Sequence, residues 1–318
     1  MLVAITGGSG FIGRRLVLRH HRQKDVVRVL SRRGDKELNF PREVQIIHGD
    51  LANNCDALRE FIDGANVVYH CAAELRCQHK MAMVNVQGTK HLLQSAAGII
   101  NHWVQLSSVG VYGPQRSGSI DEQTPVMPHN IYESTKADAD CLVQEMAPRS
   151  GFSYTILRPS IVYGPEMSNL SLYHLISAID RGLFFFVGKP GASANYIHVD
   201  NVVEGLLQCA TNPLAKNRIY NLSDFRTVEE FVAIIATALG KPVSRFRLPE
   251  SLVRLMAQVV RILPRSPLTP AHVNALTNRA RYPDKRLAQS LGYSHKISME
   301  EGLREMVLAY MRIDNNAT

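Results

Sequence analysis

The chain has 318 residues, of which 45% are hydrophobic and 20% are charged, and its formal net charge is +8. This length predicts more than one average domain with a substantial core, and the absence of a long apolar run or a signal peptide excludes an integral membrane span and favours a cytoplasmic location. The Lys and Arg residues are scattered and are not interleaved with aromatic residues. The positive charge therefore indicates a solvated basic surface or an anionic small substrate, and argues against a nucleic-acid groove.

Short apolar runs alternate with helical stretches through the first half of the chain. The runs expected to form strands are 2–5, 26–30, 44–47, 66–70, 102–106 and 154–158. Helices are expected from about residue 11, over about 80–97 and over about 132–146. Continuous apolar strands separated by helices predict a parallel sheet covered on both faces, which is an α/β fold of the doubly wound, Rossmann type.

Four glycines, Gly7, Gly8, Gly10 and Gly13, lie between the first expected strand and the first expected helix. Glycine permits a tight turn and a close approach of the backbone to a pyrophosphate, whose charge then meets the free N–H groups of the helix N-terminus. This placement predicts a dinucleotide-binding turn. A tight turn that binds no ligand is the alternative interpretation.

The pattern loosens after about residue 160. Helices are expected over about 172–181 and 202–210, a strand over 218–223, and mostly helix beyond, with breaks at several prolines. We therefore expect a dinucleotide-binding domain from residues 1–160 plus about 195–225. Residues 161–194 and about 226–318 are expected to form a smaller, mostly helical lobe that binds the substrate.

One expected helix, from Ser251 to Leu263, carries an apolar stripe at helical spacing. The stripe consists of Leu252, Leu255, Met256, Val259, Val260 and Leu263. Such a stripe predicts packing of the helix against its own protein. A lid, or a helix on a membrane surface that serves a lipid-like substrate, is the alternative.

The cysteines and two polar residues receive structural interpretations. The five cysteines, Cys55, Cys71, Cys77, Cys141 and Cys209, have neither the spacing of metal ligands nor that of a disulfide framework. They are expected to be free thiols, and no metal site is expected. His198 lies between apolar residues at strand-like alternation, which predicts a structural histidine and not a catalytic one.

Several motifs in one order resemble the extended short-chain dehydrogenase/reductase family, which contains NAD-dependent epimerases, dehydratases and reductases of nucleotide sugars. The motifs are "TGGSGFIG" from residue 6, "HGDL" from 48, "YHCAA" from 69, "LSSVGVYG" from 106, "YESTK" from 132, "LRPSIVYGP" from 157 and "NYIHVDNVVEGL" from 195. The resemblance covers about two thirds of the chain. By the same resemblance, Asn85 is expected to bond backbone groups inside the fold.

The resemblance implies that Ser108, Tyr132 and Lys136 are catalytic. Tyr132 and Lys136 are four residues apart and share one face of a helix, so the ammonium lies near the phenol and favours its ionised form. Tyr132 is then expected to exchange a proton with a substrate oxygen, while Ser108 hydrogen-bonds the reacting oxygen and Lys136 also holds the nicotinamide ribose. An amphipathic surface helix with a Tyr–Lys pair and a serine that only caps a turn are the alternative interpretations.

The resemblance also assigns a set of cofactor contacts. These are Gly7, Gly10, Phe11, Ile12, Gly13, Ser31, Arg32, Arg33, Asp50, Leu51, Ala72, Ala73, Tyr132, Lys136, Pro159 and Ile161. The second strand ends in Ser31, Arg32 and Arg33, where an NAD-specific site presents an acid to the ribose hydroxyls. Guanidinium groups pair with a 2′-phosphate, so NADP is favoured, with NAD as the alternative.

The substrate is expected to be a small molecule, and the resemblance favours a nucleotide-activated sugar handled by a 4-epimerase or a 4-keto reductase. Ser160, Ala194 and Asn195 depart from the residues usual in that branch. These departures leave open a reductase of hydrophobic ketones or alcohols similar to 3β-hydroxysteroid dehydrogenases. A non-catalytic dinucleotide-binding protein is the third hypothesis, against which the complete catalytic set argues. The family resemblance also implies a homodimer.

Overall fold

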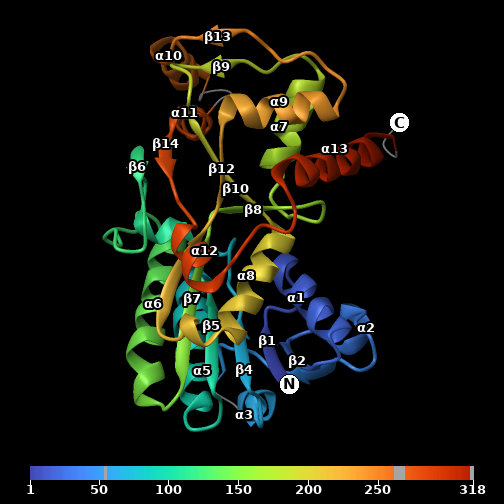
Figure 1. The fold of residues 1–318 in the computed structure, drawn as a ribbon, viewed down its shortest axis with the longest axis vertical. Helices are drawn as coiled ribbons and strands as arrows, with labels where there is room; N and C mark the ends of the chain where they lie inside the picture. The colour runs from blue at the N-terminus through green and yellow to red at the C-terminus, as the bar shows by residue number, and fades with distance from the viewer. Residues whose placement is uncertain (54–55, 261–268, 316–318) are drawn as a thin grey trace.

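The computed structural model describes residues 1–53, 56–260 and 269–315. A seven-stranded sheet forms one half of the molecule, and a smaller, largely helical lobe forms the other (Figure 1). The strands of the large sheet, in spatial order, are β11 (Arg218–Leu222), β7 (Ser153–Pro159), β5 (His102–Leu106), β4 (Val67–His70), β1 (Leu2–Thr6), β2 (Val26–Ser31) and β3 (Gln45–His48). All neighbouring pairs are parallel. The expected doubly wound Rossmann-type sheet is confirmed, and the strand order changes direction between β1 and β4.

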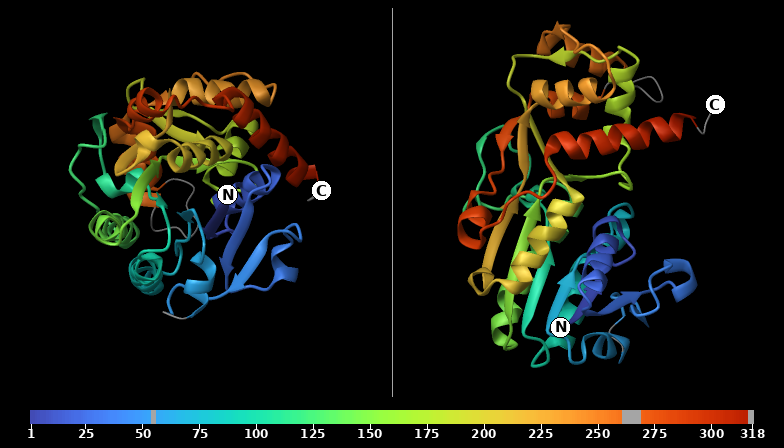
Figure 2. Two further views of the ribbon diagram at one scale, coloured as in Figure 1. Left: turned by 60° about the horizontal axis from the view of Figure 1, so that its bottom comes forward. Right: turned by 45° about the vertical axis from the view of Figure 1, so that its right-hand side comes forward.

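Strand β1 illustrates how both faces of the sheet are buried. Val3 and Ile5 point to one face, where they belong to a core that includes Leu16 and Leu206. Ala4 points to the other face and packs in a second core. The first face is covered by α1 (Phe11–Arg22) and α8 (Val199–Thr211), and the second by α3 (Asp56–Ile62), α5 (Gly88–Ala96) and α6 (Ile131–Arg149), as Figure 2 illustrates. Because both faces are covered, the strands near the centre of the sheet are mostly apolar.

The helix expected over residues 80–97 contains a change of winding. It consists of α4 (Gln78–Met81), a π-helical turn over Ala82–Gln87 and then α5. Asn85 lies in this turn; its Oδ1 accepts from the Glu74 N–H at 2.7 Å, and its Nδ2 donates to the Glu74 carbonyl at 3.2 Å. The expectation that Asn85 bonds backbone groups inside the fold is confirmed.

The smaller lobe combines helices with short strands. Its strands are β8 (Ile161–Tyr163), β10 (Ser193–His198) and β12 (Asp224–Thr227) in one sheet, β9 (Phe186–Val187) paired with β13 (Arg247–Leu248), and β14 (Arg279–Arg281) paired with β6 (Ser117–Ser119). The longer helices of the C-terminal region are α7 (Ser171–Asp180), α9 (Val228–Ala238), α10 (Glu250–Val260), α11 (Pro270–Thr277) and α13 (Met299–Asn315). Helices α7, α9 and α13 share one apolar core. The remaining short helices are α2 (Asp35–Leu38) and α12 (Lys285–Leu291).

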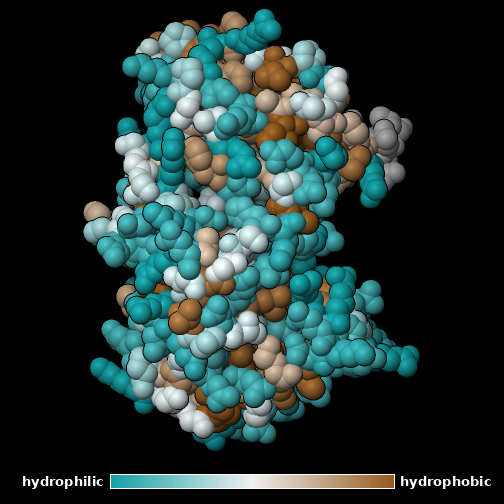
Figure 3. Space-filling model, viewed as in Figure 1, coloured by the Kyte–Doolittle hydropathy of each residue, from teal (hydrophilic) through white to brown (hydrophobic). Residues whose placement is uncertain are grey.

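The packing expected for the stripe on α10 is wrong for the residues that the structure describes. Val253 and Ala257 are the buried side chains of this helix and pack against Val187 and Val273. In contrast, Leu252, Leu255 and Met256 are exposed, Leu255 by 59%. The side chains of Val259 and Val260, and all of Leu263, lie outside the described residues. The helix therefore packs through its small residues, and apolar side chains remain on a surface where hydrophobic and hydrophilic patches alternate (Figure 3).

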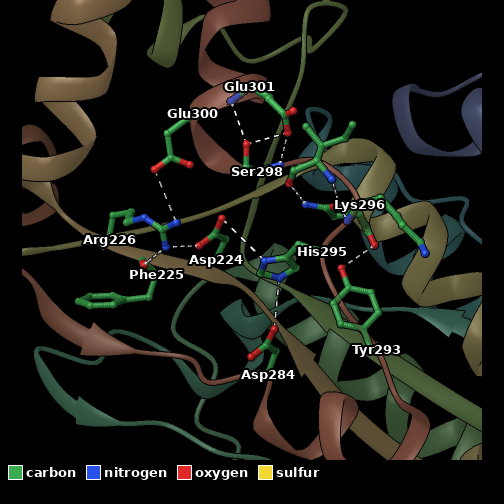
Figure 4. Close-up of polar contacts among 12 residues, drawn as sticks. Asp224, Phe225, Arg226, Asp284, Tyr293, His295, Lys296, Ser298, Glu300 and Glu301 are labelled. Atoms are coloured by element: carbon green, nitrogen blue, oxygen red, sulfur yellow. Dashed lines mark hydrogen bonds and ion pairs between the residues drawn. The ribbon is translucent and has the colours of Figure 1, made fainter.

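A polar cluster joins the small lobe to the segment between α12 and α13 (Figure 4). Asp224 accepts from Arg226 at 2.6 Å, and its other oxygen lies 3.8 Å from the His295 ring. The opposite nitrogen of that ring lies 3.2 Å from Asp284. Nearby, the Tyr293 hydroxyl donates to the Asn201 carbonyl at 3.0 Å. These contacts tie β12 and α8 to the chain that leads into α13.

Within the described ranges, Cys71, Cys77, Cys141 and Cys209 form no disulfide, and Cys55 lies outside those ranges. None of the described helices is both long enough and apolar enough for a bilayer span. The same residues contain no group of three or more acidic, histidine or cysteine side chains suited to a metal ion.

Candidate active site

A cavity of about 650 Å³ lies at the carboxyl ends of the central strands, where the strand order changes direction. Ligands of open α/β sheets bind at such a point. The walls include all of the residues for which the sequence predicts catalytic or cofactor roles, namely Gly7, Gly10, Phe11, Ile12, Gly13, Ser31, Arg32, Arg33, Asp50, Leu51, Ala72, Ala73, Ser108, Tyr132, Lys136, Pro159 and Ile161. Residues separated by up to 154 positions in the chain thus meet around one space.

The glycine loop is shaped by contacts that exclude larger side chains. Gly7 has φ +69°, and a Cβ atom there would lie 2.6 Å from the Ala72 nitrogen. A Cβ atom on Gly13 would overlap the Gly7 carbonyl. The N-cap residue of α1 is Gly10, which has no side chain to hydrogen-bond the first N–H groups of the helix. The backbone N–H groups at the start of α1 are therefore available to an anion in the cavity.

The two arginines after β2 lie at one end of the cavity. Arg32 is 67% exposed at its side chain, and one of its nitrogens lies 3.9 Å from Asp50. The other oxygen of Asp50 accepts from the Ala52 N–H at 3.0 Å. Ser31 accepts from the Arg33 N–H at 2.9 Å, which orders the turn that carries both arginines. This end of the cavity therefore offers the guanidinium groups of Arg32 and Arg33 and the carboxylate of Asp50 to a ribose or its phosphate.

Tyr132 is held at the start of α6 by a cap. Asn130 accepts from the Glu133 N–H at 3.0 Å, and the Glu133 carboxylate accepts from the His129 N–H at 2.7 Å. The helix thus begins at a fixed point, and Tyr132 lies in its first turn. Burial raises the pKa of Tyr132 to about 12, and a hydrogen bond with Ser108 offsets part of this rise.

Ser108 has the capping role that the sequence left as an alternative, and it also lies on the cavity wall. Its Oγ accepts from the Gly110 N–H at 3.0 Å and so caps the 3₁₀ turn over Val109–Tyr112. The same hydroxyl lowers the pKa of Tyr132, which indicates that it lies close to the phenol. A capping role therefore does not prevent Ser108 from lying beside the phenol.

Lys136 is buried one turn beyond Tyr132, and its ammonium donates to the Leu106 carbonyl. Burial lowers the pKa of Lys136, while the negative charge of Asp140 raises it. The charged side chains that shift the pKa of Tyr132 are Asp140 and Glu133, and both raise it. Burial and these two carboxylates therefore stabilise the protonated phenol of Tyr132 and not the ionised phenol that we expected from the sequence.

The cavity wall also includes residues that sequence reasoning missed. They are Glu74, Leu75, Val84, Met167, Ser168 and Asn169. Leu75 is 58% exposed at the rim. Glu74 and Leu75 directly follow "YHCAA", so their proximity to the cofactor motif was the available signal. Met167 to Asn169 lie in an irregular segment whose position no local pattern indicates.

His198 is buried and does not line the cavity. Its Nδ1 accepts from the Asp200 N–H at 3.3 Å and caps α8, and its Nε2 lies 3.4 Å from Glu305. These contacts agree with the structural role expected from the sequence.

A comparison with protein families gives the same assignment as the geometry. The model of the NAD dependent epimerase/dehydratase family matches residues 3–223. The chain belongs to this family. The resemblance to extended short-chain dehydrogenases/reductases is thereby confirmed. The matched residues include the glycine loop and all three catalytic candidates.

The proteins that this chain resembles have several different names and activities. Short-chain dehydrogenase/reductase family 42E member 1 of Xenopus laevis is 30% identical over 282 residues, which cover 80% of this chain and 72% of that protein. The 3β-hydroxysteroid-dehydrogenase/decarboxylase isoform 1 of Arabidopsis thaliana is 26% identical, covering 97% and 79% of the two chains. The solved UDP-glucuronic acid 4-epimerase of Bacillus cereus, in complex with NAD, has a TM-score of 0.77 at 18% identity and covers 98% of this chain and 99% of its own.

The dinucleotide cofactor of the epimerase/dehydratase family fits the residues present. The loop between β1 and α1 provides backbone approach at Gly7 and Gly13 and free N–H groups at the start of α1. Asp50 and Ser31 offer acceptors or donors for a ribose, and Lys136 offers an ammonium deep in the cavity. The residues that would hold a dinucleotide are therefore continuous along the cavity wall.

Proposed function

We propose that this chain is an NAD(P)-dependent oxidoreductase that transfers a hydride between the cofactor and a secondary alcohol or ketone, with Ser108, Tyr132 and Lys136 as its catalytic set. The observation that carries the proposal is that these three side chains and the glycine loop line one cavity. A bound nicotinamide supplies or takes up the hydride. The protein must then supply or remove a proton at the substrate oxygen, which is the task of a positioned acid or base.

Tyr132 is suited to donating that proton. Because burial raises its pKa to about 12, the phenol is protonated at neutral pH. A protonated phenol beside Ser108 gives a proton to the oxygen of a ketone as a hydride reaches its carbon.

We propose NADP(H) as the preferred cofactor. Arg32 and Arg33 lie at the end of the cavity where a 2′-phosphate would be expected, and guanidinium groups pair with phosphates through paired hydrogen bonds. NAD(H) is the alternative, supported by the NAD bound in the similar Bacillus cereus epimerase and by the carboxylate of Asp50, which suits ribose hydroxyls.

Two substrate classes have specific support. A nucleotide sugar is supported by the similarity to the UDP-glucuronic acid 4-epimerase, whose fold this chain shares. A hydrophobic ketone or alcohol is supported by the apolar side chains of Leu75, Val84 and Met167 in the cavity wall and by the similarity to the plant 3β-hydroxysteroid-dehydrogenase/decarboxylase.

Sequence identity distinguishes the two classes. The plant 3β-hydroxysteroid-dehydrogenase/decarboxylase is 26% identical to this chain, whereas the UDP-glucuronic acid 4-epimerase is 18% identical. We therefore favour a hydrophobic hydroxyl or keto compound over the nucleotide sugar.

The proposal is tested by following NADPH and NADH absorbance with a panel of hydrophobic ketones, including 3-ketosteroids, and with uridine, guanosine and thymidine diphosphate sugars. Cofactor consumption with a ketone supports the favoured reading. Conversion of one nucleotide sugar into another, detected by chromatography without a net absorbance change, supports an epimerase. A protein that binds neither cofactor in a fluorescence titration is not an oxidoreductase of this kind.

A further inference from the structure

Helix α6 carries a buried carboxylate one turn beyond Lys136. Tyr132, Lys136 and Asp140 follow one another at four-residue spacing and therefore share one face of the helix. Asp140 is only 1% exposed. An ionised carboxylate in the interior is costly unless charged and hydrogen-bonding partners compensate for the loss of water.

One carboxylate oxygen of Asp140 is the centre of a buried polar network, whereas its Oδ1 has no hydrogen-bond partner among the described residues. Its Oδ2 accepts from the Nε and Nη2 atoms of Arg158 at 3.1 and 3.0 Å and from the Ser107 hydroxyl at 2.8 Å. Arg158, on β7, is also buried, and its Nη1 donates to the Tyr112 hydroxyl at 3.0 Å. Tyr112 in turn donates to Asn221 on β11 at 2.9 Å. The network links α6 to two strands of the sheet directly beneath the cavity.

The charges of this network bear directly on Lys136. Lys136 and Arg158 are two buried cations. Asp140 forms an ion pair with Arg158 and lies one helical turn from Lys136 on the same face of α6. The negative charge of Asp140 raises the pKa of Lys136 against the effect of burial. The other titratable groups that interact with these side chains in the described chain are His70, Cys71, Tyr112, Tyr132, Glu133 and Cys141. Burial lowers the pKa of His70 and raises that of Cys71, so both are neutral at pH 7 and leave Asp140 as the main counter-charge.

We propose that Asp140 is a positioning residue, whose buried ion pair with Arg158 keeps Lys136 in its ammonium form in the cavity and whose bond to Ser107 fixes the strand end that carries Ser108. This inference rests on the proposed function, in which Lys136 holds the nicotinamide ribose. Asp140 lies off the cavity wall and acts through Lys136 and Ser107, which both lie on it.

The test is the Asp140→Asn variant, measured as the pH dependence of NADPH affinity and of kcat/KM. Removing the carboxylate lowers the pKa of Lys136, so the ammonium loses its proton at a lower pH. Two charges on one helix face, about 5–6 Å apart at their Cβ atoms, interact strongly enough to move the alkaline fall of NADPH affinity down by about 1–2 pH units. A general loss of structure would lower affinity at every pH without moving this fall.

Three further variants separate charge from packing. Asp140→Glu keeps the charge and should keep the alkaline fall near its wild-type pH. Tyr112→Phe removes one bond of the network but keeps Asp140, so it should lower the melting temperature and leave the fall where it was. If Asp140→Asn does not fold, the charge-balanced double variant D140N/R158Q, which leaves no unpaired buried guanidinium, should fold and show the shift.

The outcomes distinguish this inference from the proposed function. An unchanged pH profile in folded Asp140→Asn or D140N/R158Q, with a wild-type protein that binds NADPH and transfers hydride, overturns the role of Asp140 alone. A wild-type protein that binds no dinucleotide at any pH overturns the proposed function instead. A shift shared by Tyr112→Phe would attribute the effect to packing, and so would also contradict the inference.

Discussion

The two ends of the cavity are built in different ways. At the nucleotide end, the ligand surface is mostly backbone: the glycine loop, the first N–H groups of α1 and the chain after β4. At the proposed catalytic end, the surface is made of side chains from separate segments, such as Ser108, Tyr132 and Lys136. A backbone surface depends on a short local pattern, whereas a side-chain surface depends on how remote segments pack. We therefore expect the first end to select the cofactor and the second to select the substrate.

The largest effect is expected at the catalytic end. Tyr132→Phe removes the hydroxyl that donates the proton, so turnover should fall by roughly 10²–10⁴-fold, while NADPH affinity stays near the wild-type value. Tyr154→Phe is a matched control, because Tyr154 is the second residue of β7, at the amino end of the strand, and does not line the cavity. Turnover and fluorescence titration give the two readouts. Near wild-type turnover in Tyr132→Phe would remove the tyrosine from the mechanism.

The second prediction concerns His70, the buried last residue of β4. His70 Nδ1 lies 2.8 Å from the Thr6 hydroxyl and Nε2 lies 2.9 Å from the Thr89 hydroxyl, and burial lowers the pKa of His70 to about 3. Its folded pKa is below the usual value of about 6.5, so its contribution to stability is full above that pH and is lost as the pH falls toward 3. At pH 5 the loss is about 2 kcal/mol.

Urea unfolding at pH 7.5 and pH 5 measures this loss. The His70→Gln variant should be less stable at pH 7.5 and should lose about 2 kcal/mol less than the wild type on acidification. His102, whose pKa burial lowers to about 4, still titrates in the variant and leaves a residual dependence. Equal acid sensitivity in both proteins would contradict the assignment to His70.

The third prediction tests the backbone character of the nucleotide end. Gly7→Ala combines an unfavourable φ with a Cβ atom 2.6 Å from the Ala72 nitrogen, whereas Gly64→Ala has nearly the same φ, +67°, with no atom within 4 Å. Strain of about 1–3 kcal/mol should weaken NADPH binding about 10–100-fold for Gly7→Ala. Gly64→Ala should change the melting temperature only. Equal NADPH affinities in the two variants would mean that the loop does not approach the cofactor closely.

The smallest effect concerns the exposed arginines. The double variant R32A/R33A should lose about tenfold in NADP affinity, with little change for NAD, because exposed charge pairs contribute modestly. Arg22→Ala, another exposed arginine on the same half of the molecule, is the control and should change neither affinity. Isothermal titration at two salt concentrations measures the preference. A wild-type protein that binds NAD more tightly would reverse the cofactor assignment.

Most of the nucleotide end could be predicted from the sequence, because its residues follow strands directly and their chemistry depends on local backbone shape. The roles of Tyr132 and Lys136 came from the resemblance of "YESTK" to the family motif, and their four-residue spacing predicted that they share a helix face. Asp140 was missed although it lies a further turn along, because helical spacing alone does not indicate that Arg158 packs against it. The prediction that the apolar stripe on α10 packs against the protein was wrong, because periodicity identifies an apolar face but does not show which face packs. Val253 and Ala257 form the face that packs.

The core shared by α7, α9 and α13 has a consequence for how the chain is made. Residues 3–223, which the family model matches, include nearly all of the seven parallel strands, so the large sheet can assemble before the rest of the chain leaves the ribosome. Helix α7 is translated early, but its partner α13 follows more than 100 residues later. At about 5–20 residues per second, the apolar face of α7 waits seconds for that partner. We therefore expect the small lobe to be the part of the nascent protein that completes its core last.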